Sequence, residues 1–278
     1  MRCLRYDRLE RKVLAIGMVA ASLLGGASIA NAGPPMPATD EALRALIDGA
    51  DDDANFGDAD YAILLDEADV YVRTSGLATT QVCQLIKVLT ESGVRRHCVQ
   101  RFDYDPATRR VTLERVRVHH SDGRVDDVPL NASPTSGPPV QPTVQEAIYW
   151  GGEQIVVSVP NLRIGDVIEL RLSKIGFNIA YLNEAESGSA GGEETLQPPM
   201  PGHWYEVTLF AGRQPIKHKR YSVHVPSGMP MQFEVYNGPL KTSQWLDGER
   251  MVYTFTAEDV PAIKSEPHRA AARMKLAR

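Results

Sequence analysis

Several motifs that mark common enzyme classes are absent from this 278-residue sequence. It contains no glycine-rich phosphate loop, no G-x-S-x-G nucleophile motif and no H-E-x-x-H zinc motif. Cysteine is scarce as well, with three residues in all. The enzyme classes that depend on those three motifs are therefore excluded. We predict no catalytic residue, no metal site and no cofactor.

A basic field is also lacking. The formal net charge is −5, and it falls to −8 when the five basic and two acidic side chains of residues 1–32 are left out. Proteins that bind nucleic acid neutralise phosphates with clustered lysine and arginine. We therefore expect no nucleic-acid partner.

The first residues have the pattern of a secretory signal. Five basic residues within positions 1–12 precede the apolar run VLAIGMVAASLLGGASIA, and Ala30-Asn31-Ala32 then forms an A-x-A cleavage box. A membrane anchor would need about 20 apolar residues without interruption. We predict a signal peptide over residues 1–32, cleaved between Ala32 and Gly33. The product would be periplasmic or secreted, with no membrane contact after cleavage.

From residue 60 onward, alternating apolar and polar runs are separated by turn residues such as Asp122-Gly123. This pattern predicts an all-β fold, an antiparallel β-sandwich of one or two β units, with a short N-terminal leader helix at TDEALRALIDG. The predicted parts are a mobile acidic leader (33–59), a first β part (60–182), a flexible loop or hinge (183–202), a second β part (203–259) and a linker-like tail (260–278).

The two cysteines that follow the signal, Cys83 and Cys98, flank the sequence TESG, which predicts a turn between neighbouring strands. An even number of cysteines in an exported chain is compatible with one disulfide. A bridge requires Cα atoms within about 7 Å. The alternative is that both are small buried apolar residues.

The other potentially reactive residues are better explained by structural roles than by catalysis. Cys98 adjoins His97, with Asp103 nearby, but adjacent residues of a strand point to opposite faces, so His97 is badly placed to activate the thiol. We expect His119, His120, His218 and His224 to be solvated strand residues.

The acidic run from Asp51 to Asp60 lacks the glycine and glutamate positions of a calcium loop, so we expect a disordered leader there. Aromatic residues bury a large area, which favours the core for Trp150, Trp204 and Trp245. The alternative is that they line an exposed ligand groove.

An ordered series of motifs resembles the DUF3857 family. It runs from LIKVLTESG through FDYDP and VTLERVRVHHSDGRV to VPNLRIGDVIEL, and it covers most of residues 60–175. The resemblance implies a β module that commonly precedes a transglutaminase-like domain. Such a domain is a papain-like cysteine hydrolase or acyltransferase. VPAIKSEP is similar to the junction into that domain. No position of this sequence matches its catalytic triad.

The resemblance therefore implies an exported, non-catalytic module that serves a transglutaminase-like domain or protein as an accessory or binding part. Two alternatives stay open. The chain could be the N-terminal fragment of a larger transglutaminase-like enzyme, or it could be an independent module that binds envelope carbohydrate or peptide.

Overall fold

The computed structural model describes residues 39–50, 56–130, 135–136, 153–178, 196–236, 238 and 240–263. The predicted signal peptide, its cleavage site at Ala32 and Gly33, most of the predicted hinge and most of the tail lie outside these residues. Within them, no helix is long and apolar enough to span a membrane.

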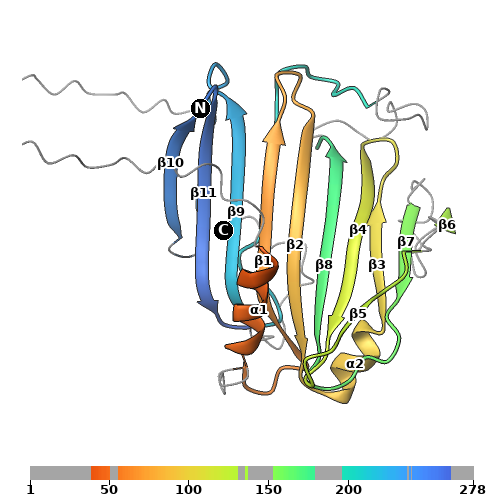
Figure 1. The fold of residues 1–278 in the computed structure, drawn as a ribbon. Coiled ribbons are helices and arrows are strands. Elements are labelled where there is room, and N and C mark those ends of the chain that lie inside the picture. The colour runs from red at the N-terminus through yellow and green to blue at the C-terminus, as the bar shows by residue number, and fades with distance from the viewer. Residues whose placement is uncertain are drawn as a thin grey trace, which may run out of the picture. The chain divides into compact units, whose positions relative to one another are not determined.

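Strands dominate the described chain, which confirms the all-β prediction (Figure 1). The elements are α1 (Asp40–Asp48), β1 (Tyr61–Val72), β2 (Ala78–Val88), α2 (Glu91–His97), β3 (Val99–Tyr104), β4 (Arg109–His119), β5 (Val125–Asp127), β6 (Thr135–Ser136), β7 (Glu153–Ser158), β8 (Val167–Gly176), β9 (Ile216–Pro226), β10 (Lys241–Asp247) and β11 (Arg250–Val260).

The strands form two sheets. The larger has eight strands in the order β10-β11-β9-β1-β2-β8-β4-β5, and the smaller has the order β3-β7-β6. All pairs are antiparallel except β1 with β9. Because that pair joins a strand of the first predicted β part to one of the second, both parts contribute to a single sheet.

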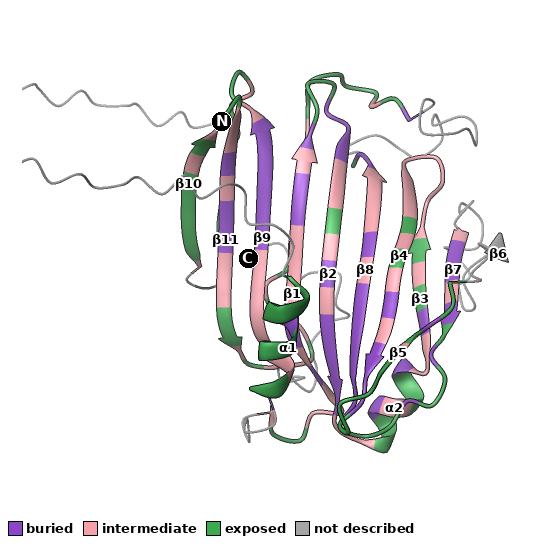
Figure 2. Cartoon of the chain, viewed as in Figure 1, coloured by how far each residue is buried: buried purple, intermediate pink, exposed green. Residues whose placement is uncertain are grey.

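The core between the two sheets explains why the strands pack this way. Alternate residues of a strand point to the same face, and on one face of the large sheet these are Ile86, Val116 and Ile168, which pack against Ile155 and Val157 of the small sheet. Figure 2 shows buried residues along the central strands, whereas β10 at the edge is mostly exposed.

Helix α1 covers part of the opposite face of the large sheet. Thr39 caps it by accepting a hydrogen bond from the backbone N–H of Ala42 at 3.3 Å. Leu43 is its single fully buried residue, and it packs with Leu65 and Leu85. The leader helix predicted from TDEALRALIDG is therefore present, and Leu46 and Ile47 add partly buried contacts to the same cluster.

The turn predicted at residues 90–93 is wrong, because α2 begins there. Thr90 is its N-cap and accepts a hydrogen bond from the N–H of Gly93, and the last turn carries Arg95 and Arg96, whose positive charges interact favourably with the negative end of the helix dipole. A Cβ atom at Gly93 would lie 2.2 Å from the carbonyl oxygen of Asp60. Only glycine allows α2 this close approach to the chain that precedes β1.

Candidate functional site

Charged side chains gather across the middle of the large sheet, on the face that carries α1. We call this set the charged tract; its members are Glu67, Asp69, Arg115, Arg117, His119, Glu169, Arg171, Arg220 and His224. Register explains the common face, because directly opposed residues of neighbouring strands point the same way. Cys83 of β2 faces Glu67 on one side and Arg171 on the other.

The charged tract has two halves. Glu169 is the centre of the half on β4 and β8. Its side chain is 1% exposed; Oε1 lies 2.7 Å from Nε of Arg171 and Oε2 lies 2.9 Å from Nε2 of His119. Burial alone would raise the pKa of this carboxyl. The hydrogen bonds from His119 and Arg171, together with the charge of Arg171, outweigh burial and lower the pKa to about 2. Glu169 is therefore an ionised carboxylate throughout the physiological range.

Asp69 and Arg220 are the centre of the other half, on β1 and β9. The guanidinium of Arg220 donates to both carboxylate oxygens of Asp69, at 2.9 and 3.2 Å, and to Glu67 at 3.1 Å. Burial acts to raise the pKa of Asp69, but the nearby His224, whose Nε2 lies 3.8 Å from Oδ1, and the hydrogen bonds and charge of Arg220 lower it overall. His224 is buried and stacks on Tyr71, with ring centroids 4.3 Å apart.

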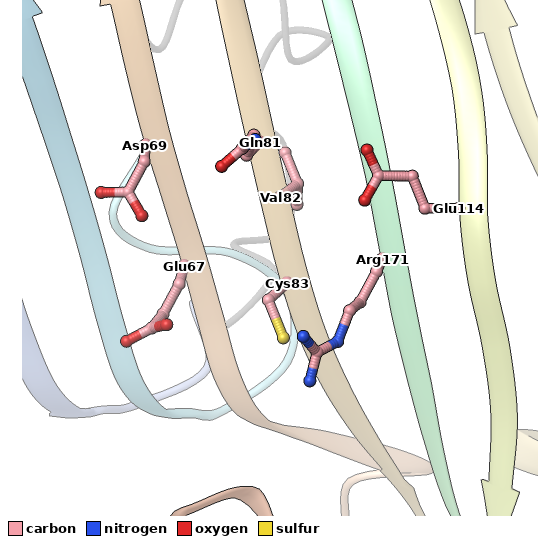
Figure 3. Close-up of a pocket in the computed structure, with 7 residues that line it drawn as sticks. All are labelled: Glu67, Asp69, Gln81, Val82, Cys83, Glu114 and Arg171. Carbon is pink, nitrogen blue, oxygen red and sulfur yellow. The ribbon is translucent and has the colours of Figure 1, made fainter. Parts of the chain in front are cut away.

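A polar pocket of about 90 Å³ lies between the two halves (Figure 3). It is lined by Glu67, Asp69, Gln81, Val82, Cys83, Glu114 and Arg171. Pockets for drug-sized ligands hold roughly 300 to 1,000 Å³, so this one admits only a small group. Burial raises the pKa of the Cys83 thiol to about 12. At neutral pH it is a protonated thiol, which is a poor nucleophile.

The side chains of Cys98 and His97 make hydrogen bonds to different partners. The Sγ atom of Cys98 donates to the carbonyl oxygen of Arg95 at 3.2 Å, whereas Nδ1 of His97 lies 3.2 Å from the amide nitrogen of Gln100. Burial, aided by the charge of Arg96, lowers the pKa of His97 to about 4. Asp103 accepts a hydrogen bond from Gln154. The side chains of Cys98, His97 and Asp103 thus have separate hydrogen-bond partners in the structure.

Both Cys83 and Cys98 are free thiols in the structure, so the disulfide that their spacing allowed is not formed. The physical reason is α2. Residues 91–97 are helical, and Cys98 is the C-cap of that helix instead of a strand residue opposite Cys83. The residues across from Cys83 are Glu67 and Arg171.

The prediction that the histidines are solvated is wrong for three of them. His119, His120 and His224 are buried, at 9%, 7% and 1% exposure. Nδ1 of His120 lies 2.9 Å from Oδ2 of the buried Asp166, which compensates for its burial. Among the residues that the structure describes, no three histidine, cysteine or acidic side chains could hold a metal ion together.

The other sequence candidates are structural or lie outside the described residues. Asp60, at the end of the acidic run, accepts from the hydroxyl groups of Thr90 and Ser92 at 2.8 and 3.2 Å and so ties α2 to the start of β1. Residues 51–55 and Trp150 are outside the described residues. Trp204 packs against the core around β9, as predicted, and Trp245 is half-buried on β10.

A comparison with known families returned a match over most of the chain. The profile named DUF3857, described as a domain of unknown function with a solved structure, matches residues 74–264. The chain belongs to the DUF3857 family. A comparison with curated proteins returned no match.

A comparison with solved structures returned matches at low sequence identity. The chain superposes on a crystal structure of a candidate protease from Parabacteroides distasonis with a TM-score of 0.58 and 17% identity, covering 77% of this chain and 38% of that one. An M1 zinc metallopeptidase of Deinococcus radiodurans gives a TM-score of 0.34, 16% identity and coverage of 72% and 40%. Leukotriene A4 hydrolase of Saccharomyces cerevisiae gives 0.34, 12%, 73% and 28%. This DUF3857 chain thus spans less than half the length of each.

The charged tract was not predicted from the sequence. The signal was present in VIELRLS, where Glu169 and Arg171 alternate with buried Ile168, Leu170 and Leu172. Alternation alone places Glu169 and Arg171 in solvent. Only strand order brings His119 of β4 and Cys83 of β2 beside them and makes that face partly buried.

Proposed function

We propose that this DUF3857 chain is an exported, non-catalytic module that binds a transglutaminase-like domain or protein and serves it as an accessory part. The observation that carries the proposal is the environment of Cys83 and Cys98, the two thiols that the structure describes. Cys83 is buried, and its thiol has a pKa of about 12. The thiol of Cys98 donates a hydrogen bond to a backbone carbonyl instead of to a histidine. A cysteine hydrolase needs a thiolate beside a base, and neither thiol has that setting.

The accessory role is supported by the likeness to the candidate protease. The shared fold accounts for 38% of that chain, so in that protein the β fold is joined to a further part of the polypeptide. Family resemblance makes a transglutaminase-like domain the proposed counterpart here. The charged tract is less suited to docking, because most of its carboxylates and guanidinium groups already pair with each other.

The surface best suited to this partner is an apolar stripe formed by Tyr205, Val207 and Leu209, which are 52%, 48% and 62% exposed. Their neighbours Trp204 and Phe210 pack inward against the core around β9. The segment thus has the alternation of a strand, with its outer apolar face in solvent. Exposed apolar patches of this kind mark interaction sites, and an extended segment can add to the sheet of a partner.

Binding to a purified transglutaminase-like domain from the same host tests the proposal. We expect a complex whose affinity falls at least tenfold when Val207→Glu and Leu209→Glu are introduced together, since a buried unpaired charge opposes docking. Ile164→Glu is the matched control, because Ile164 is 48% exposed but lies in the turn before β8.

Two outcomes would overturn the proposal. The first is peptidase or transamidase activity in residues 33–278 that is lost in Cys83→Ala or Cys98→Ala. The second is binding to envelope polymer or peptide with no binding to the domain, which would instead establish an independent binding module.

A further inference from the structure

Three guanidinium groups converge on one carboxylate at the edge of the charged tract. Oδ1 of Asp40 lies 3.0 Å from Nη2 of Arg171 and 3.6 Å from Nη1 of Arg115, and Oδ2 lies 3.3 Å from Nη1 of Arg117. Arg115 and Arg117 belong to β4 and Arg171 to β8, whereas Asp40 is the first residue of α1. Both oxygens of one carboxylate are therefore bound by three arginines from two strands.

The pairing of β4 with β8 places positive charges close together, so a nearby carboxylate stabilises this part of the sheet. A bulge after Leu113 sets Arg115 directly opposite Arg171, and like charges in opposed positions destabilise a sheet. Two further carboxylates compensate in part, because Nε of Arg171 lies 2.7 Å from Glu169 and Nε of Arg117 lies 2.9 Å from Asp127. Asp40 supplies a third carboxylate to these three arginines.

Asp40 is held lightly in this position. Its side chain is 56% exposed, and exposed ion pairs contribute little net stability because water competes for both charges. The helix that carries it buries only Leu43 completely among its nine residues. A second carboxylate can therefore replace Asp40 without disturbing the two sheets.

We propose that Arg115, Arg117 and Arg171 form a carboxylate-binding site that α1 occupies in cis through Asp40. The ligand is an acidic side chain or the terminal carboxylate of a peptide, and it competes with Asp40. Glu169 and Asp127 favour a singly charged carboxylate over phosphate, because both would repel a doubly charged anion. This site is independent of the apolar stripe and of the partner proposed for it.

Titration of the purified full chain with two probes tests the proposal: an acetylated and amidated triglutamate peptide, which offers side-chain carboxylates, and free triglycine, which offers a terminal one. Removing the internal competitor raises the population of the open site. We therefore expect Asp40→Asn to bind at least one probe about tenfold more tightly than the unchanged chain. Glu41→Gln is the matched control, since Glu41 is the neighbouring acidic residue of the same helix turn; its affinity should equal that of the unchanged chain.

The proposal makes two further predictions. Probe binding depends on the arginines, and it displaces α1. Arg115→Gln should weaken probe binding at least tenfold, with circular dichroism and thermal unfolding confirming that the variant is folded. Saturating probe should accelerate hydrogen exchange of the α1 amides, which binding elsewhere on the surface would not do. Equal affinity in Asp40→Asn and Glu41→Gln, undiminished binding by Arg115→Gln, or tighter binding of inorganic phosphate than of either peptide would overturn the proposal.

Discussion

Nε2 of His119 on β4 lies 2.9 Å from Oε2 of Glu169 on β8, and both side chains are buried. The pair belongs to a tract in which most charges are compensated by partners on adjacent strands, so removing Glu169 leaves its buried partners without their carboxylate. A buried ion pair need not be more stable than an apolar pair, but breaking one is costly.

Glu169→Gln should therefore destabilise the fold. We expect the free energy of unfolding to fall by about 3 kcal/mol, because Arg171 and His119 lose their shared carboxylate. Urea unfolding measures this loss. Glu114→Gln is the control, because Glu114 is exposed on β4 and its change should stay within about 0.5 kcal/mol. Equal losses in both variants would show that the buried network adds no stability.

His97 should make stability depend on pH. Burial, with a smaller contribution from Arg96, lowers its pKa from 6.5 to about 4. Between these values the unfolded chain binds a proton that the folded chain does not. Stability is therefore complete above pH 6.5 and declines as the pH falls to 4, by about 3 kcal/mol.

Unfolding in urea at a series of pH values checks this dependence. His97→Gln should flatten the curve between pH 6.5 and 4, whereas His203→Gln, at an exposed histidine, should leave its slope unchanged. An unaltered slope in His97→Gln would assign the dependence to other groups.

Gly93→Ala should destabilise the chain, although alanine is the better helix former by about 1 kcal/mol. The added Cβ atom would lie 2.2 Å from the carbonyl oxygen of Asp60, and relieving such a contact costs about 1 to 3 kcal/mol. We expect a net loss of about 2 kcal/mol in urea unfolding. Gly212→Ala meets open space and should be neutral. A stabilised Gly93→Ala would mean that α2 lies farther from Asp60.

The two free thiols should differ in reactivity. Cys83 is 2% exposed and has a pKa of about 12, whereas Cys98 is partly exposed. In a chain with Cys3→Ser, brief treatment with iodoacetamide should modify Cys98 alone, and intact mass and peptide mapping measure the site. If neither thiol reacts until a reductant is added, the two are joined by a disulfide after all.

The period-2 alternation and the turn residues from residue 60 onward were sufficient to predict an all-β chain, because burial of one strand face requires that pattern. The leader helix was equally predictable from its cap at Thr39 and its stop at Gly49. The ordered motifs from LIKVLTESG to VPNLRIGDVIEL identified the family. These features are local, so they can be read along the chain.

The tertiary structure alone decided the features that depend on strand order. The parallel pairing of β1 with β9 brings Arg220 to Asp69, although they are far apart in the chain. The placement of β8 between β2 and β4 buries His119 against Glu169. Alternation tells which residues share a face of one strand, but not which strand lies beside it. For that reason the charged tract and the arginines around Asp40 emerged only from the folded chain.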